Sequence, residues 1–148
     1  MKIRVALADD HKPFRQALRS MLERHADIEI VGEAGDGNAA LDLVRSTLPD
    51  VAVMDIRMPG FSGIAALRQL AETDPGVKVI VLSVTSEPFF AEEMLRAGAS
   101  GYVTKADADE LPHAIRAVQS GSDYLSAEVA STTGAPARVG LNLQTSKP

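Results

Sequence analysis

Short runs of apolar, mostly branched residues alternate along this chain with segments whose apolar residues recur at helical spacing. The runs lie at residues 3–8, 28–31, 51–54, 77–82 and 102–103, and such short apolar runs are typical of buried strands. After the first run, Phe14, Ala17, Leu18, Met21 and Leu22 follow the i, i+3, i+4, i+7, i+8 spacing of a helix with one apolar stripe. Similar stripes lie at residues 41–48, 64–70, 91–95 and 111–118. The pattern predicts five consecutive βα units.

This alternation predicts an α/β fold in which helices cover both faces of a parallel sheet. We expect right-handed crossovers and a flavodoxin-like, doubly wound sheet with strand order 2-1-3-4-5. Turn and capping residues agree with these elements. Ser62 and Ser86 are expected as helix N-caps, and Pro88 and Pro112 are expected in first helical turns.

The regular pattern ends near residue 125. Residues 126–148 are mostly small and polar, with isolated apolar positions. We therefore expect one domain over residues 1–125 and a tail or linker over residues 126–148.

Composition narrows the function classes. The 148 residues include 20 acidic and 15 basic side chains, for a formal charge of −5. Because a net negative chain repels nucleic acid, we expect no DNA binding by this chain itself. The absence of cysteine excludes disulfides and thiolate metal sites. A charged N-terminus and the lack of a long apolar stretch predict a cytoplasmic protein without a membrane partner.

Polar residues with catalytic potential follow four of the expected strands. Asp9 and Asp10 follow the first strand, Asp55 the third, Ser83 ends the fourth and Lys105 follows the fifth. Carboxyl ends of parallel strands share one edge of the sheet, where ligands bind at the switch point. We expect the three carboxylates and the lysine to lie together there.

The expected charge of this group predicts a divalent cation. Three carboxylates and one ammonium leave two negative charges, which one divalent ion would cancel. An oxygen-only site with few protein ligands suits Mg²⁺. A carboxylate beside Mg²⁺ and a lysine is a competent phosphoryl acceptor, and the Ser83 hydroxyl can donate to a phosphoryl oxygen.

Each of these residues alone has a commoner structural explanation. Asp9 and Asp10 could be helix caps, Ser83 a turn residue, Lys105 a solvated surface residue and Tyr102 a core residue. His11, next to the acids, is expected to face solvent rather than bind metal. The functional interpretation is favoured because suitable residue types follow four strands together, in the order that the chemistry requires.

The sequence resembles the receiver domains of two-component response regulators over roughly residues 1–125. The matching segments are Ala8-Asp9-Asp10-His11, Val53-Met54-Asp55-Ile56-Arg57-Met58-Pro59-Gly60, Val79-Ile80-Val81-Leu82-Ser83 and Gly101-Tyr102-Val103-Thr104-Lys105. The resemblance implies direct Mg²⁺ ligation by Asp10, Asp55 and the Arg57 carbonyl, with Asp9 holding the ion through water.

The resemblance also implies the reaction. Asp55 would take a phosphoryl group from the phosphohistidine of a sensor kinase, while Ser83 and Lys105 would hold it. Tyr102 would report the change by rotating from an exposed to a buried position. The chain would catalyse only its own phosphorylation and dephosphorylation and is not expected to be a conventional enzyme.

Further segments are similar to the NarL/FixJ (LuxR-type) branch, whose members usually have a C-terminal helix-turn-helix domain. They are Ala97-Gly98-Ala99-Ser100-Gly101-Tyr102, Ala114-Ile115-Arg116-Ala117-Val118 and Tyr124-Leu125-Ser126. The tail is too short for such a domain. We therefore expect a solitary receiver or a fragment of a transcription regulator, which forms a homodimer when phosphorylated.

Two positions depart from the common receiver pattern. Ser83 stands where threonine is more frequent, and Ala106 follows Lys105 where many receivers have proline, so we expect a trans Lys105–Ala106 peptide.

Three other classes of protein fit the sequence less well. A haloacid-dehalogenase-like phosphatase needs an acid two residues after the nucleophile, where this chain has Arg57. Asp9-Asp10 would repel the phosphate of a flavin nucleotide. A pseudo-receiver typically lacks a site acid, and none is missing here.

Overall fold

The computed structural model describes residues 1–60 and 62–133. The strands are β1 (Ile3–Ala8), β2 (Ile28–Ala34), β3 (Val51–Asp55), β4 (Lys78–Ser83), β5 (Gly101–Thr104) and β6 (Tyr124–Leu125). The helices are α1 (Lys12–Glu23), α2 (Gly37–Thr47), α3 (Gly63–Thr73), α4 (Pro88–Ala97), the 3₁₀ helix η1 (Lys105–Glu110), α5 (Leu111–Gln119) and α6 (Ala127–Thr133). The five expected βα units are present.

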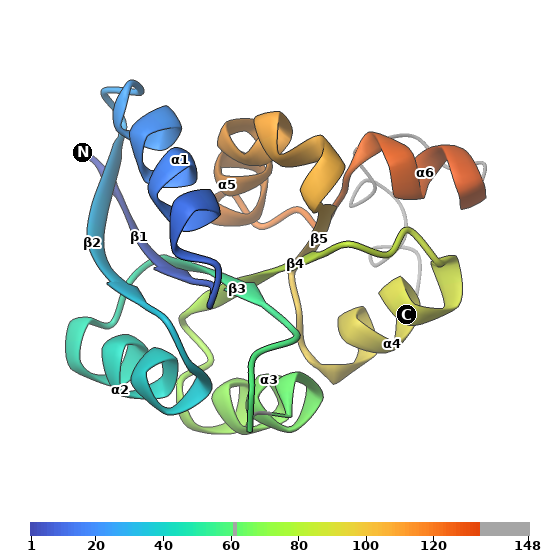
Figure 1. Cartoon of the computed structure of the whole chain (residues 1–148), viewed down its shortest axis with the longest axis horizontal. Coiled ribbons are helices and arrows are strands. Elements are labelled where there is room, and N and C mark those ends of the chain that lie inside the picture. The colour runs from blue at the N-terminus through green and yellow to red at the C-terminus, as the bar shows by residue number, and fades with distance from the viewer. Residues whose placement is uncertain (61, 134–148) are drawn as a thin grey trace.

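All strands pair in parallel in the order β2-β1-β3-β4-β5-β6 (Figure 1). This confirms the predicted flavodoxin-like order 2-1-3-4-5 and adds one short strand beside β5. The core has two layers because neighbouring strand residues face opposite sides of the sheet. Val51 and Val53 pack with Leu18 and Ile115 in the cluster beneath α1 and α5.

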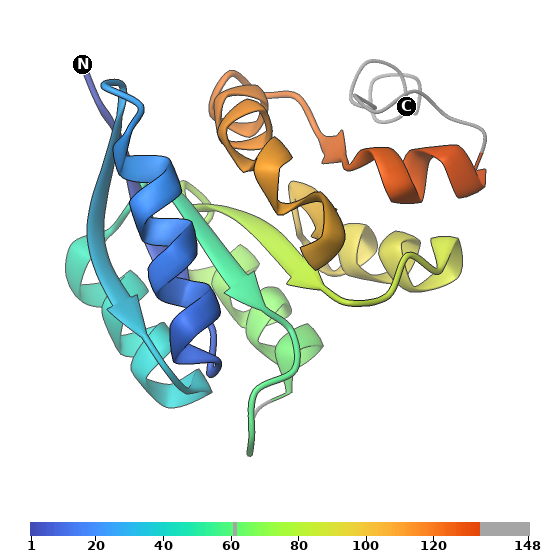
Figure 2. The same cartoon turned by 45° about the horizontal axis from the view of Figure 1, so that its top comes forward.

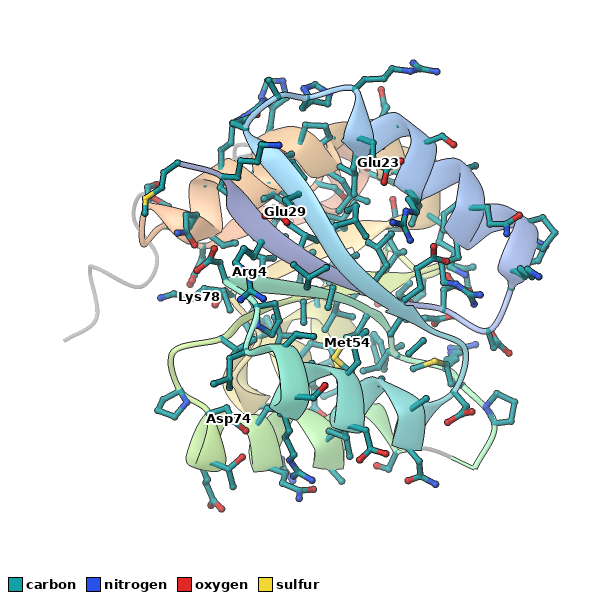
Figure 3. All side chains as sticks on the ribbon, turned by 90° about the vertical axis from the view of Figure 1, so that its left-hand side faces the viewer. Arg4, Glu23, Glu29, Met54, Asp74 and Lys78 are labelled. Carbon is teal, nitrogen blue, oxygen red and sulfur yellow. The ribbon has the colours of Figure 1, made fainter. Side chains whose placement is uncertain are left out.

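The opposite face of the sheet contacts α2, α3 and α4. Ala52 and Met54 belong to this cluster, and Figure 3 shows Met54 on the side of the sheet where α2 lies. All residues of β3 are buried. Since both faces are covered, only the ends of the central strands remain open for chemistry.

Local signals are mostly as expected. The Ser62 hydroxyl accepts a hydrogen bond from Ala65 N and caps α3, and Pro88 and Pro112 lie in the first turns of α4 and α5. The expected cap at Ser86 was wrong: α4 begins one residue later, with Glu87 at the N-cap and no side-chain bond there. No peptide bond of the described residues is cis, so Lys105–Ala106 is trans as predicted.

Residues 127–133 form α6, where sequence analysis predicted an irregular tail. Val129 and Ala130 are buried, and α6 contacts α4, β5 and η1 (Figure 2). The helix has too few apolar residues for a periodic signal, and an isolated helix this short is unstable, so its tertiary contacts decide its structure. The remainder of the expected tail, residues 134–148, lies outside the described residues. The domain boundary at residue 125 stays a prediction.

Candidate phosphoryl-acceptor site

The carboxyl edge of the sheet gathers the acidic residues that the sequence placed there. Asp9 follows β1 and Asp55 ends β3, and β1 and β3 are paired neighbours. Carboxylate oxygens of Asp9, Asp10 and Asp55 all lie within 4.8 Å of one another. Asp9 and Asp55 are buried, whereas Asp10 is exposed. The predicted convergence of three carboxylates is therefore present.

Lys105 completes this group from the end of β5. Its Nζ lies 2.9 Å from Asp9 Oδ2 and 3.3 Å from Asp55 Oδ2. Burial alone would lower the pKa of Lys105, but the close contact with Asp9 and the charges of both carboxylates outweigh it and raise the pKa. Lys105 is consequently a fixed cation between two buried acids.

Backbone amides orient both buried carboxylates. Asp9 Oδ1 accepts a hydrogen bond from His11 N at 2.8 Å, and Asp55 Oδ1 accepts one from Arg57 N at 2.9 Å. Burial raises the pKa of Asp55 above its ordinary value, and the charge of Asp9 adds to this, while the Arg57 amide and Lys105 oppose it. Two carboxylates this close repel each other, so a further cation would stabilise the pair.

The donor set fits Mg²⁺. Asp9 Oδ2 is buried and accepts no hydrogen bond of acceptable geometry from the described residues, although Lys105 Nζ lies near it. Lys105 supplies one positive charge against three carboxylates, so a divalent cation would still be attracted to this group. The group offers oxygen ligands alone, and exposed Asp10 leaves room for the waters that Mg²⁺ keeps.

Ser83 and Tyr102 meet at a common residue beside this group. Ser83 Oγ accepts a hydrogen bond from Thr85 N at 3.3 Å, and Tyr102 donates its hydroxyl to Thr85 O at 2.7 Å. Ser83 ends β4, whose Leu82 pairs with Asp55 in register. Tyr102 is fully buried, so the structure shows the inward position and not the exposed starting position that sequence analysis expected. Burial raises the pKa of Tyr102.

Sequence reasoning missed two contributors on α1. Phe14 places its ring 4.7 Å from Lys105 Nζ, and Arg15 donates to Asp9 O and to Glu33 Oε1. The sequence pattern predicts Phe14 only as a member of the apolar stripe of the helix. Helical spacing gives no signal for a contact with a residue as distant in sequence as Lys105.

The fold and this group of side chains define a doubly wound α/β domain with an acidic, lysine-containing site at its carboxyl edge. The family model of the response regulator receiver domain matches residues 5–116. The chain is 40% identical over 129 residues to response regulator GacA of Pseudomonas aeruginosa, covering 86% of this chain and 60% of that protein. It is 39% identical to the transcriptional regulatory protein DegU of Brevibacillus brevis, covering 86% and 55% of the two chains.

Similar solved structures also belong to response regulators. A LuxR-family two-component response regulator from Aurantimonas sp. SI85-9A1 is 37% identical with a TM-score of 0.83, covering 88% of this chain and 94% of that one. The receiver domain of the response regulator NarL from Mycobacterium tuberculosis is 35% identical with a TM-score of 0.77, covering 81% and 98%. The chain belongs to the response regulator receiver domain family and is a receiver domain of the two-component type.

The chain spans 55–60% of the length of the curated relatives just described. None of the helices among residues 1–60 and 62–133 combines the length and apolarity required to span a bilayer.

Proposed function

We propose that Asp55 is the phosphoryl acceptor of this receiver domain. The observation that supports this most strongly is the position of its carboxylate. It is buried at the end of β3 and contacts Lys105 Nζ, which also contacts Asp9. The backbone bond to Arg57 fixes one carboxylate oxygen and directs the group toward the edge of the sheet. Family members use an aspartate, and Asp55 is the buried acid at the end of the central strand.

The proposed reaction is an in-line displacement. A carboxylate oxygen of Asp55 attacks the phosphorus of a phosphohistidine on a sensor kinase, and the P–N bond breaks with its electron pair remaining on the imidazole nitrogen. Lys105 neutralises charge on the equatorial oxygens, and the Ser83 hydroxyl donates to one of them. The same residues would hold the group afterwards, so catalysis is confined to the chain's own phosphorylation and dephosphorylation.

Mg²⁺ is the proposed cofactor, held by Asp10, Asp55 and the Arg57 carbonyl, with Asp9 acting through water. When bound, it would supply the positive charge that allows an anionic carboxylate to approach a phosphoryl group. Three carboxylates against the single positive charge of Lys105, together with the oxygen-only donor set, support this proposal.

At the level of the whole protein, we propose a role in transcription regulation with homodimer formation upon phosphorylation. The support is the name of DegU, a transcriptional regulatory protein, and the solved structure of two RcsB dimers bound to two parallel DNAs. DNA contact would then belong to a segment other than residues 1–125.

The test is incubation with acetyl phosphate and Mg²⁺, followed by intact-mass measurement. The parent should gain one phosphoryl group, and Asp55→Asn or excess chelator should prevent the gain. Asp42→Asn, an exposed acid on α2, is the matched control and should be phosphorylated like the parent. Phosphorylation of Asp55→Asn at the parental rate would exclude Asp55 as the acceptor.

A further inference from the structure

The Phe14 ring lies beside the ammonium group of Lys105. Lys105 Nζ is 4.7 Å from the ring centroid, within the distance at which a cation is attracted to an aromatic face. The His11 ring is nearly parallel to that of Phe14, with an interplanar angle of 10° and centroids 6.4 Å apart. The side chain of Lys105 keeps only 20% of its surface exposed. Phe14 therefore helps to enclose the Lys105 ammonium group.

The core packing of α1 does not require an aromatic residue at this position. Leu18 and Leu22 are the buried residues of α1, whereas Phe14, in its first turn, is only partly buried. An aliphatic side chain would also cover the edge of the apolar cluster. It would lack the negative ring face that attracts a cation.

The contact matters most when a divalent cation is present. Asp9 and Asp55, the two carboxylates that attract Lys105 in this structure, are also proposed to hold Mg²⁺. The ion would neutralise those carboxylates and repel the Lys105 ammonium, so the electrostatic attraction on Lys105 falls. The Phe14 ring is uncharged and takes no part in metal binding, and its attraction for Lys105 persists.

We propose that Phe14 is a positioning residue for phosphoryl transfer, acting by holding Lys105 Nζ beside Asp55. This inference rests on the proposed function of Asp55. It adds a residue that the receiver motif does not include, and it assigns the aromatic character of Phe14 to the reaction and not to the core. Without the ring, Lys105 would spend less time where the equatorial oxygens of the phosphoryl group lie.

The first test measures the contact without any phosphodonor. The ring should displace the NMR resonances of the Lys105 Cε protons through its ring current, with and without Mg²⁺, and Lys105→Arg identifies those resonances. Phe14→Leu should return them to ordinary lysine positions, while Phe14→Tyr should keep them displaced. Ordinary Lys105 resonances in the Mg²⁺-loaded parent would overturn the inference.

The second test measures the phosphorylation rate with acetyl phosphate and Mg²⁺. Phe14→Leu should be slower by about threefold to tenfold, since a cation–aromatic contact at a partly buried position is of that size. Phe14→Tyr should restore the rate to within about twofold for the same reason. Met21→Ala, on the same helix and also partly buried, is the control for general destabilisation of α1 and should react like the parent.

The outcomes separate the two proposals. Parental rates in both Phe14→Leu and Phe14→Tyr, with phosphorylation still dependent on Asp55, would overturn the role of Phe14 and leave the proposed function intact. A parent that accepts no phosphoryl group would overturn both. If Phe14→Leu does not fold, as judged by thermal unfolding, Phe14→Met provides the aliphatic comparison, and an unchanged rate there would equally overturn the inference.

Discussion

Both carboxylate oxygens of Glu110, the last residue of η1, lie 3.1 Å from the backbone nitrogen of Ala127, the first residue of α6. The same carboxylate accepts a hydrogen bond from the Tyr124 hydroxyl at 2.7 Å, and Asp107 of η1 accepts one from Glu128 N at 2.7 Å. The N-terminus of α6 is thus capped by side chains from another helix. Since η1 begins at Lys105, α6 is attached to the segment that carries the site lysine.

Replacing Glu110 by alanine should loosen α6. The change removes a cap and a hydroxyl partner, so we expect a loss of about 1–2 kcal/mol in the free energy of unfolding, and faster amide hydrogen exchange at residues 127–130. Asp109→Ala, an exposed neighbour in η1 that makes none of these bonds, is the control. Exchange rates in Glu110→Ala equal to those of Asp109→Ala would show that the cap does not hold the helix.

The site residues at the strand ends could be predicted from sequence, whereas the helix α6 and the contact of Phe14 with Lys105 could not. Asp9, Asp55, Ser83 and Lys105 lie where apolar runs stop, and a parallel sheet brings such ends to one edge. The stability of α6 instead depends on Asp107 and Glu110, whose hydrogen bonds to it leave no periodic pattern. The same holds for the Phe14–Lys105 contact, which joins side chains that are 91 positions apart, counted from the sequence numbering.

Asp10→Asn should weaken Mg²⁺ binding by about tenfold or more, because the variant removes one anionic ligand from a site that depends on charge. Isothermal titration with Mg²⁺, or a beryllium fluoride titration at fixed Mg²⁺, measures the change. Asp42→Asn, an exposed acid on α2 that is not among the three grouped carboxylates, serves as the control. An affinity equal to the parental value would show that Asp10 is not a ligand.

The ion pair between Asp27 and Arg116 predicts a pH dependence. Arg116 Nε lies 2.8 Å from Asp27 Oδ2, and this hydrogen bond is the main cause that lowers the pKa of Asp27 to about 2 from 3.8. A carboxyl with a depressed pKa stabilises the folded state above its unfolded pKa, and this contribution disappears as the pH falls toward the folded value. The difference in Tm between the parent and Asp27→Asn should be constant above about pH 5 and should shrink between about pH 4 and pH 2.

A direct measurement of this pair is the ¹³C chemical shift of the Asp27 carboxyl during an acid titration. The midpoint should lie near 2 in the parent and should rise toward the ordinary aspartate value in Arg116→Gln. A parental midpoint close to that of the variant would show that the pair does not form in solution.

The last prediction concerns Thr85, whose backbone N–H and carbonyl bind two different side chains, those of Ser83 and Tyr102. Ser83 Oγ accepts its N–H, and the Tyr102 hydroxyl donates to its carbonyl. Phosphorylation of Asp55 adds strong acceptor oxygens beside Ser83. When the Ser83 hydroxyl turns to donate to one of them, Thr85 should move with it, and the position of Thr85 should change the environment of Tyr102. A hydrogen bond supplies only about 1–3 kcal/mol, so this is a shift between populated states.

Beryllium fluoride with Mg²⁺ should therefore perturb the NMR resonances of the Thr85 amide and the Tyr102 ring in the parent. Ser83→Ala should still bind the mimic at Asp55 but should lose most of the Tyr102 perturbation, along with any change in sedimentation that the mimic causes in the parent. Tyr102→Phe keeps the buried ring and removes the bond to Thr85, so its ring should respond less although Ser83 is intact. If Ser83→Ala binds the mimic and shows the parental response at Tyr102, the signal reaches the fifth strand by another route. Coupling through Thr85 requires both substitutions to weaken it, since each removes one of the two bonds that hold this residue.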